Sequence, residues 1–386
     1  MDAFLGFGPS RPPNRVQDRF DMTTRLAIAA AFALAMPTLA APPQVECWLL
    51  NEIGRTGYNG LEADVQQVKY NASYVYVSCS SVPAYSIGPW PANPNTPVDG
   101  NWGFRITRNP TPKTGTKTAT GLGHIGVWVN GVAIYNASDA RSYNNKNVWH
   151  QNAIMVEGPS FDACGGHPSP NGEYHNHQNA ACIFDETPAL HSSIVGFGFD
   201  GYPIYGPYGY ANADGTGEIR MMRSSYRKRS ITTRTTLPNG TVLTSANYGP
   251  AVSATYPIGY YVEDFEYVPG YGELDAYNGR TCITPEYPQG TYAYFVTIDA
   301  NGVPAYPYMI GPAYYGVVDT LNTTSGRITP ASDAVNYSIF DLDESGATDL
   351  GDLSYMLLNI GGRTPGDVDG DGVVGPSDIS LLLLNM

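Results

Sequence analysis

All six histidines of the chain lie between positions 124 and 191, and two of them form a His-x-His pair, His175 and His177. On an extended backbone, side chains two residues apart point to the same face, so these imidazoles can bind one ion while Tyr174 and Asn176 face away. Imidazole nitrogen suits zinc, copper, iron and nickel. The pair therefore predicts a transition-metal site, for instance for copper or zinc.

Such a site needs at least one further ligand, and His167 and His150 are the best candidates in the sequence. An open coordination position would make the ion catalytic, whereas a closed shell would make it structural. A hydrogen-bonded histidine cluster without any metal remains the alternative.

Two cysteines bracket the histidine pair. A bridge between Cys164 and Cys182 would hold this segment rigid, as a metal site requires. The simplest second pair is Cys47 with Cys79, which leaves Cys282 over, although four cysteines already allow three connectivities. Thiolate ligation of a metal is the alternative role.

The elements that must position these residues are predicted to be strands. The 386-residue chain contains 43 glycines, 31 prolines and 29 tyrosines, and only 15% of its residues are charged, which favours a turn-rich β body over a helical bundle. Alternating runs at 73–78 and 126–130 predict strands, and Asn130-Gly131 predicts a hairpin turn. The net charge of −14 argues against a nucleic-acid partner.

The N-terminal 40 residues have the pattern of a secretory signal peptide. Arg25 precedes a short apolar run at 26–36, which a small-residue segment follows. The alternative to a signal peptide is a buried Ala-rich helix. Met22 is the better start, so the 21 residues before it are expected to be a mis-assigned extension. No other apolar run has membrane length. We expect a secreted protein, extracellular or periplasmic.

The acidic C-terminal segment contains a duplication, because residues 352–360 match residues 378–386. An acidic loop with alternate oxygen side chains precedes each copy, in the spacing that encloses a calcium ion. The predicted ligands of the two calcium ions are Asp341, Asp343, Ser345, Asp349 and Asp352 in the first loop, and Asp367, Asp369, Asp371 and Asp378 in the second.

These two loops resemble dockerin type I modules over about residues 341–386. The resemblance implies a small α-helical, calcium-dependent module that docks to a cohesin-like or cell-surface partner. Gly375 stands at position 9 of the second loop, where the family has a polar residue.

The histidine-rich part resembles the YHYH domain family over about residues 101–315. The resemblance rests on segments 148–153, 162–168 and 172–177, and on the run 198–207. The Tyr-His-Tyr-His motif stands here as Tyr-His-Asn-His. The resemblance implies a metal-binding domain and no defined activity.

We therefore expect a mainly β protein with a large turn-rich body at 42–318, a linker at 319–336 and a helical module at 337–386. One hypothesis is a metalloenzyme, either a hydrolase or an oxidoreductase, that acts on an extracellular polymer. The other is a non-enzymatic surface or matrix protein that holds a structural metal and is anchored through its tail.

Overall fold

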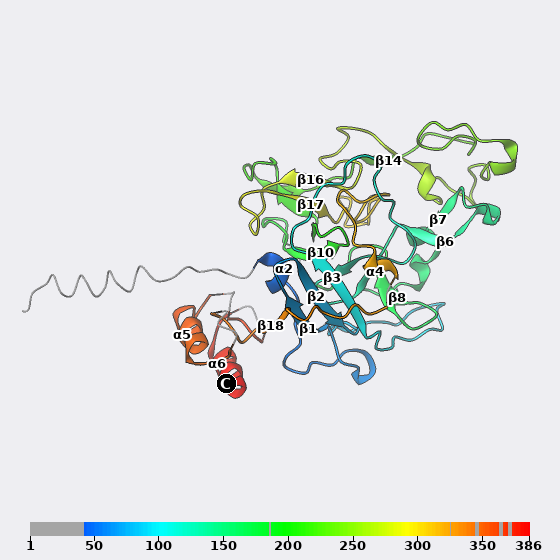
Figure 1. The fold of residues 1–386 in the computed structure, drawn as a ribbon. Coiled ribbons are helices and arrows are strands. Elements are labelled where there is room, and N and C mark those ends of the chain that lie inside the picture. Colours follow the sequence, from blue (N-terminus) through cyan, green and yellow to red (C-terminus); the bar gives the residue numbers. More distant parts are fainter. Residues whose placement is uncertain (1–41, 185–186, 325, 344–346, 363–365, 370–372) are drawn as a thin grey trace, which may run out of the picture. The chain divides into compact units, whose positions relative to one another are not determined.

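Two β-sheets form the framework of the protein in the computed structural model (Figure 1). The structure describes residues 42–184, 187–324, 326–343, 347–362, 366–369 and 373–386. The predicted signal peptide at 1–40 lies outside these residues. The fold is mainly β, as the composition predicted.

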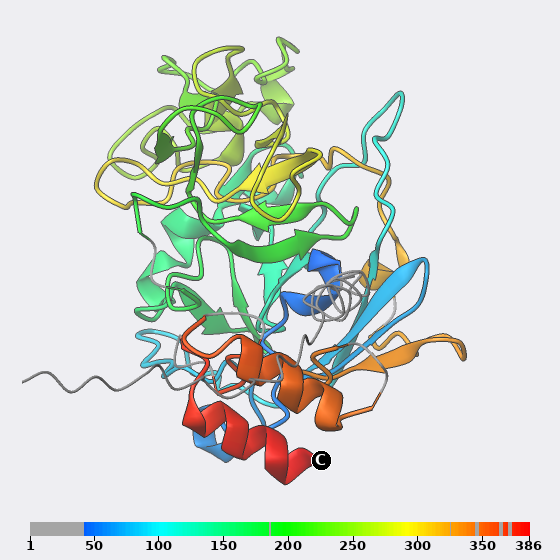
Figure 2. The same ribbon diagram turned by 90° about the vertical axis from the view of Figure 1, so that its left-hand side faces the viewer.

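The first sheet has four antiparallel strands (Figure 2). Its central strand β2 is buried along almost its whole length, so its side chains are covered on both faces of the sheet. The strands follow in the order β18 (Val335–Tyr337), β1 (Val65–Tyr70), β2 (Tyr74–Cys79) and β3 (Trp102–Thr107).

The second sheet has eight strands and carries the histidine segment at one edge. Two of its pairings are parallel, β11 with β17 and β5 with β9. The strands follow in the order β16 (Gly279–Cys282), β17 (Thr291–Phe295), β11 (Pro203–Tyr205), β10 (Ile194–Gly198), β4 (His124–Trp128), β5 (Ala133–Tyr135), β9 (Tyr174–Asn176) and β8 (Gly166–Pro168).

The predicted hairpin turn at Asn130-Gly131 is confirmed between β4 and β5, which pair antiparallel. Gly131 has a φ of 78°, and its amide donates to the carbonyl of Trp128 at 2.8 Å. A Cβ atom at Gly131 would lie 2.3 Å from the Cβ of Cys79, so both the turn and the packing against β2 require glycine.

Three two-stranded sheets account for the remaining strands in the described residues. They are β6 (Ser138–Ser142) with β7 (His150–Asn152), β12 (Tyr208–Tyr210) with β13 (Ile219–Met221), and β14 (Tyr226–Lys228) with β15 (Phe265–Tyr267). Long loops join them, as the abundance of glycine and proline suggested.

The α-helices in the described residues are few. Three have a single turn: α2 (Pro43–Glu46), α3 (Ala153–Val156) and α4 (Leu321–Thr324). The two longer ones are α5 (Leu350–Leu358) and α6 (Pro376–Asn385), which coincide with the duplicated segments and contact each other (Figure 1). None of these helices combines the length and the apolar character that a membrane span requires.

The two larger sheets bury one shared apolar cluster, whose members include Val77, Val127, Phe197 and Ile204. Each such side chain contributes roughly 1.5–3 kcal/mol when it is fully buried. A separate small cluster contains Met356 of α5 and Leu382 of α6. The histidine segment is therefore attached to a well-packed framework.

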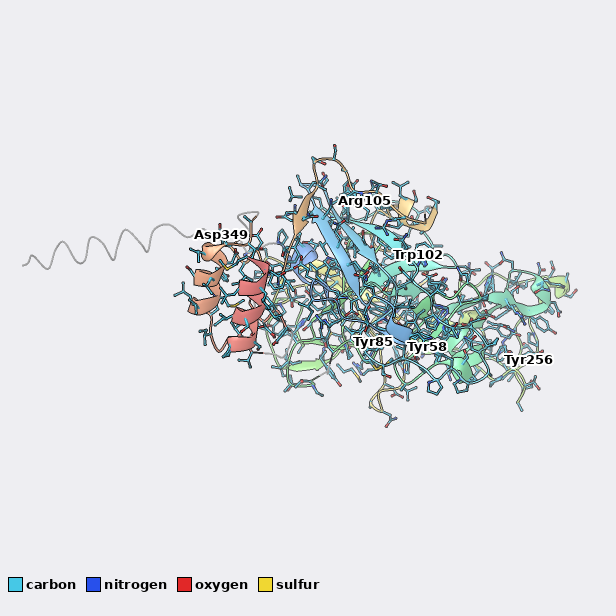
Figure 3. All side chains as sticks on the ribbon, turned by 90° about the horizontal axis from the view of Figure 1, so that it is seen from below. Tyr58, Tyr85, Trp102, Arg105, Tyr256 and Asp349 are labelled. Atoms are coloured by element: carbon cyan, nitrogen blue, oxygen red, sulfur yellow. A yellow bond between two sulfur atoms is a disulfide. The ribbon has the colours of Figure 1, made fainter. Side chains whose placement is uncertain are left out.

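The segment predicted as a linker makes specific contacts with the first sheet. Asn322 of α4 accepts a hydrogen bond from the backbone amide of Arg105, at 2.8 Å, and donates to the Arg105 carbonyl, at 2.7 Å. Arg105 lies on β3 (Figure 3), and its guanidinium also pairs with Asp319 at 2.6 Å. These contacts fix the first part of residues 319–336 to β3.

Candidate metal centre

The antiparallel pair β8–β9 places three histidines together. His167 lies directly opposite His175 in the register, and their ring centroids are 4.7 Å apart. His177 follows on the same face, 5.1 Å from His175. The intervening Tyr174 and Asn176 face away: Tyr174 donates to the carboxylate of Asp162, and Asn176 approaches the carbonyl of Cys164. The predicted alternation of faces is therefore confirmed.

A disulfide between Cys164 and Cys182 encloses this segment, as predicted. The second predicted pair is wrong, because Cys47 and Cys79 are free thiols, as is Cys282. The two thiols have different surroundings: the charge with the largest effect on Cys47 is that of Glu286, whereas for Cys79 it is that of Glu173. Burial raises the pKa of both thiols well above the usual value, which does not favour metal-binding thiolates.

Glu157, which the sequence analysis did not identify, completes the cluster. It caps the C-terminus of α3, and its Oε2 lies 3.0 Å from Nε2 of His167 and 3.3 Å from Nε2 of His177. One ligand atom from each of Glu157, His167, His175 and His177 lies within 4.8 Å of all the others. No spacing rule points to Glu157, because only the fold brings the end of this helix to the strands.

The second nitrogen of each ring shows how the cluster is oriented. Nδ1 of His177 lies 2.7 Å from the carbonyl of Asn136, and Nδ1 of His175 lies 3.1 Å from that of Glu173. A carbonyl only accepts, so both nitrogens carry a proton. Nδ1 of His167 faces Ser160, whose hydroxyl already donates to the Glu157 carbonyl and therefore accepts from the ring.

In the neutral tautomer, His167 and His177 thus turn a lone pair on Nε2 toward the Glu157 carboxylate, and a ring nitrogen of His175 lies within 4.8 Å of the same ligand atoms. Lone pairs that converge on a carboxylate require a positive charge between them, which is supplied either by protons or by a metal ion. Histidine ligands of metals characteristically donate their other N–H to a carbonyl or a similar acceptor. This arrangement fits a metal.

The charges of the cluster lead to the same interpretation. Burial disfavours the ionised form of Glu157, but the neighbouring imidazoles of His167 and His177 outweigh it and hold the pKa of this carboxyl well below its usual range. Burial, together with the two neighbouring imidazoles, lowers the pKa of His175 well below its usual value. A neutral imidazole beside an ionised carboxylate is the form in which these groups bind metal.

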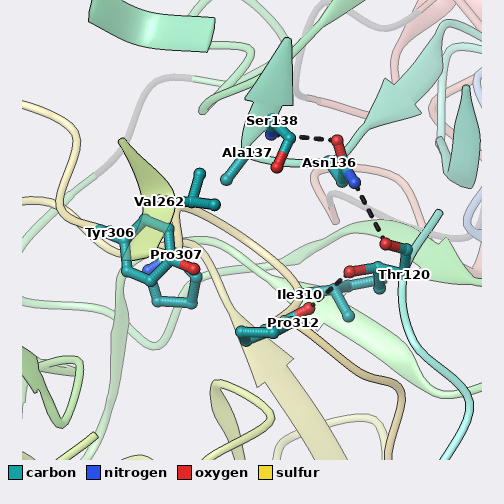
Figure 4. Close-up of a pocket in the computed structure, with 10 residues that line it drawn as sticks. Thr120, Asn136, Ala137, Ser138, Val262, Tyr306, Pro307, Ile310 and Pro312 are labelled. Atoms are coloured by element: carbon teal, nitrogen blue, oxygen red, sulfur yellow. Dashed lines mark hydrogen bonds between the residues drawn. The ribbon is translucent and has the colours of Figure 1, made fainter. Parts of the chain in front are cut away.

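Asn136, whose backbone carbonyl accepts the hydrogen bond from Nδ1 of His177, is itself held in place. The side chain of Asn136 donates to the Thr120 carbonyl at 3.1 Å and accepts from the Ser138 amide at 3.0 Å (Figure 4). A cavity of about 80 Å³ lies beside these groups and is separate from the histidine rings. Asn136 thus helps to hold His177 in its place in the cluster.

The cluster opens into a second, larger cavity of about 660 Å³. Tyr135 lines it, stacks on His175, and donates its hydroxyl to Glu173 at 2.9 Å. Asp139 also lines it; burial and the neighbouring Glu157 raise the pKa of the Asp139 carboxyl. A metal held by the cluster would therefore face a space in the size range of ligand pockets, roughly 300–1,000 Å³.

The structure does not bring His150, the fourth candidate, to this cluster. Its Nδ1 lies 2.6 Å from Glu263, and its Nε2 lies 2.9 Å from Oδ1 of Asn147. The hydrogen bond to Glu263 raises the pKa of His150. His124 similarly pairs with Glu173, at 2.6 Å. Both histidines therefore pair with carboxylates other than Glu157.

The two acidic loops bring three predicted ligands together in each case, namely Asp341, Asp343 and Asp352, and Asp367, Asp369 and Asp378. The last member of each set is buried and accepts three backbone amides: Asp352 from Leu342, Asp343 and Asp349, and Asp378 from Val368, Asp369 and Gly375. Asp349 caps α5 by accepting from the Gly351 amide. Ser345 and Asp371 lie outside the described residues.

Comparison with known proteins gives one family. Residues 103–307, more than half of the chain, match the family model described as YHYH protein, close to the 101–315 expected from the motifs. No curated protein and no solved structure matches the chain. The matched range includes Glu157 and the three converging histidines. The chain therefore belongs to the YHYH protein family.

Proposed function

We propose that the YHYH domain of this protein binds one transition-metal ion through Glu157, His167, His175 and His177. The observation that carries the proposal is the orientation of the rings: Nδ1 of each is held by an acceptor, which leaves Nε2 for an ion, and one ligand atom from each of the four residues lies within 4.8 Å of the others. Nitrogen and carboxylate donors suit copper, zinc, iron and nickel.

The cavity favours a functional ion over a structural one. Four protein donors complete the shell of tetrahedral zinc, whereas copper or iron with more ligands would keep a position on the side of the cavity. We therefore propose a metalloenzyme that acts on an extracellular polymer, either as a hydrolase or as an oxidoreductase. A bound ion would supply Lewis-acid or redox chemistry there. The second candidate is a non-enzymatic surface protein with a structural metal.

Metal analysis of the purified protein tests this proposal. We expect about one equivalent of transition metal in the wild type and a loss of it in the double variant His175→Ala/His177→Ala with an unchanged circular dichroism spectrum. His191→Ala is the matched control, because His191 bonds the Ser192 carbonyl away from the cluster. Loss of metal together with unfolding would favour the structural alternative, and a metal-free wild type would refute both.

We also propose that residues 337–386 form a dockerin-like, calcium-binding module that anchors the exported protein to a cohesin-like or cell-surface partner. Leu357 and Leu358 of α5 are 50% and 76% exposed, and their counterparts in the duplication, Leu383 and Leu384, are 53% and 81% exposed. Solvent-exposed leucine pairs on both helices suit a protein partner. Binding of the full chain to a cohesin, with and without a calcium chelator, tests this module.

A further inference from the structure

Besides the histidines, the large cavity beside the Glu157–histidine cluster has one basic side chain among the described residues that line it. Among the described residues that line it, Arg141 is the only arginine or lysine. Arg141 lies on β6 and is exposed. Its guanidinium forms no ion pair and no side-chain hydrogen bond within the described part of the chain, whereas Arg223, Arg227 and Arg234 all pair with carboxylates. Arg141 is therefore available to a ligand.

A second polar group comes from the same wall of the cavity. Gln151 lies on β7, the partner of β6, and also lines the cavity. In the part of the chain that the structure describes, its carboxamide is not engaged in a hydrogen bond. The β6–β7 hairpin thus offers a guanidinium and an amide to the cavity that also exposes Glu157 and His175.

We infer that this cavity binds a hydroxylated carboxylic acid, such as an acidic sugar or a hydroxy acid, with its carboxylate on Arg141. A guanidinium matches a carboxylate with two parallel hydrogen bonds, and an amide N–H can add a third. The cavity of about 660 Å³ accommodates a ligand of this size. The inference rests on the proposed metal site, because a hydroxyl of the ligand would face the ion.

The choice of a carboxylate over a phosphate follows from the other charges. Glu157 and Asp139 line the same cavity, so a doubly charged phosphate would meet more repulsion than a singly charged carboxylate. A neutral sugar would offer the guanidinium no charged partner and so no charge-assisted hydrogen bond.

Isothermal titration of the full-length, copper-loaded protein with D-glucuronate tests the inference. The neutral methyl ester of glucuronate and glucose 6-phosphate serve as comparison ligands. We expect glucuronate to bind about tenfold more tightly than the ester, since a charge-assisted hydrogen bond is worth that factor. Arg141→Gln should abolish this difference, and Gln151→Leu should reduce it a few-fold.

Arg227→Gln is the matched control, because Arg227 is an exposed arginine on β14, where it pairs with Glu266. It should bind glucuronate as the wild type does. Equal binding of the acid and the ester by the wild type, tighter binding of glucose 6-phosphate, no detectable binding of glucuronate, or an unaffected Arg141→Gln variant would each overturn the inference. Metal content is measured separately in every variant, so a failure of the metal site is distinguishable from a failure of anion recognition.

Discussion

The phenol ring of Tyr135 stacks on the imidazole of His175, with centroids 4.0 Å apart and an interplanar angle of 26°. The two residues come from the parallel strands β5 and β9. Glu173 connects them again: its carbonyl accepts from His175, and its carboxylate accepts from Tyr135. Tyr135 is therefore a positioning residue for one proposed ligand.

Replacing Tyr135 should separate the two contacts. Tyr135→Phe keeps the stacked ring and loses only the hydroxyl, so the metal affinity should change little. Tyr135→Leu removes the stack, which is worth about 0.5–1.5 kcal/mol, and should weaken metal binding up to about tenfold. Competition with a chelator of known affinity measures both variants. Equal affinities of the two variants would refute the role of the ring.

Glu157→Gln tests the ligand that the fold adds to the histidines. The amide keeps the shape of the side chain but removes the negative charge, so we expect metal affinity to fall by at least about tenfold. Glu266→Gln, at an exposed ion pair, is the control. Equilibrium dialysis against zinc measures the affinity, and wild-type binding in the Glu157 variant would contradict the ligand set.

Asp200 should make the stability depend on pH. Burial raises the pKa of its carboxyl to about 6. Hydrogen bonds from the Tyr294 hydroxyl and the Gly316 amide act in the opposite direction but are outweighed. Because the folded state holds this proton more tightly, its contribution to the free energy of unfolding is full below about pH 4 and is lost as the pH rises through about 6.

At about 1.4 kcal/mol per pKa unit, the move from 3.8 to about 6 corresponds to about 3 kcal/mol. Asp200→Asn should remove this dependence. Urea unfolding of both proteins between about pH 4 and pH 7 measures the difference. A constant difference over that range would contradict the assignment.

Arg234 and Asp264 form a fully buried ion pair, with Nη2 and Oδ2 2.7 Å apart. Asp264 also accepts from the amides of Gly259 and Tyr261, so the pair fixes the loop that precedes β15. Arg234→Met would leave a buried carboxylate without its partner and should cost about 3–5 kcal/mol. Thermal or urea unfolding measures this loss, and Arg227→Met, at an exposed pair, should cost less than about 1 kcal/mol.

The duplicated acidic loops should bind calcium independently. Asp378→Asn removes one carboxylate of the second cluster, and Asp352→Asn removes its counterpart in the first. Isothermal titration of the chelator-treated protein with calcium should show two sites in the wild type and one in each variant. Two unchanged sites in either variant would contradict the loop assignment.

The sequence predicted the segments that depend on local pattern. The same-face placement of His175 and His177 follows from the period of an extended chain, and the turn at Asn130-Gly131 follows from residues that accept a positive φ. The bridge between Cys164 and Cys182 also followed from position. The pairing of Cys47 with Cys79 failed because cysteine order does not state which thiols meet.

What the sequence alone determined is therefore a β-rich family domain, in which His175 and His177 lie on one face of an extended segment. It also determined an acidic duplication that follows this domain along the chain. Tertiary structure decided which other groups reach those histidines. It directed His150 to Glu263 and brought Glu157 to His167, because contacts between distant segments depend on strand pairing and packing, which spacing along the chain does not encode.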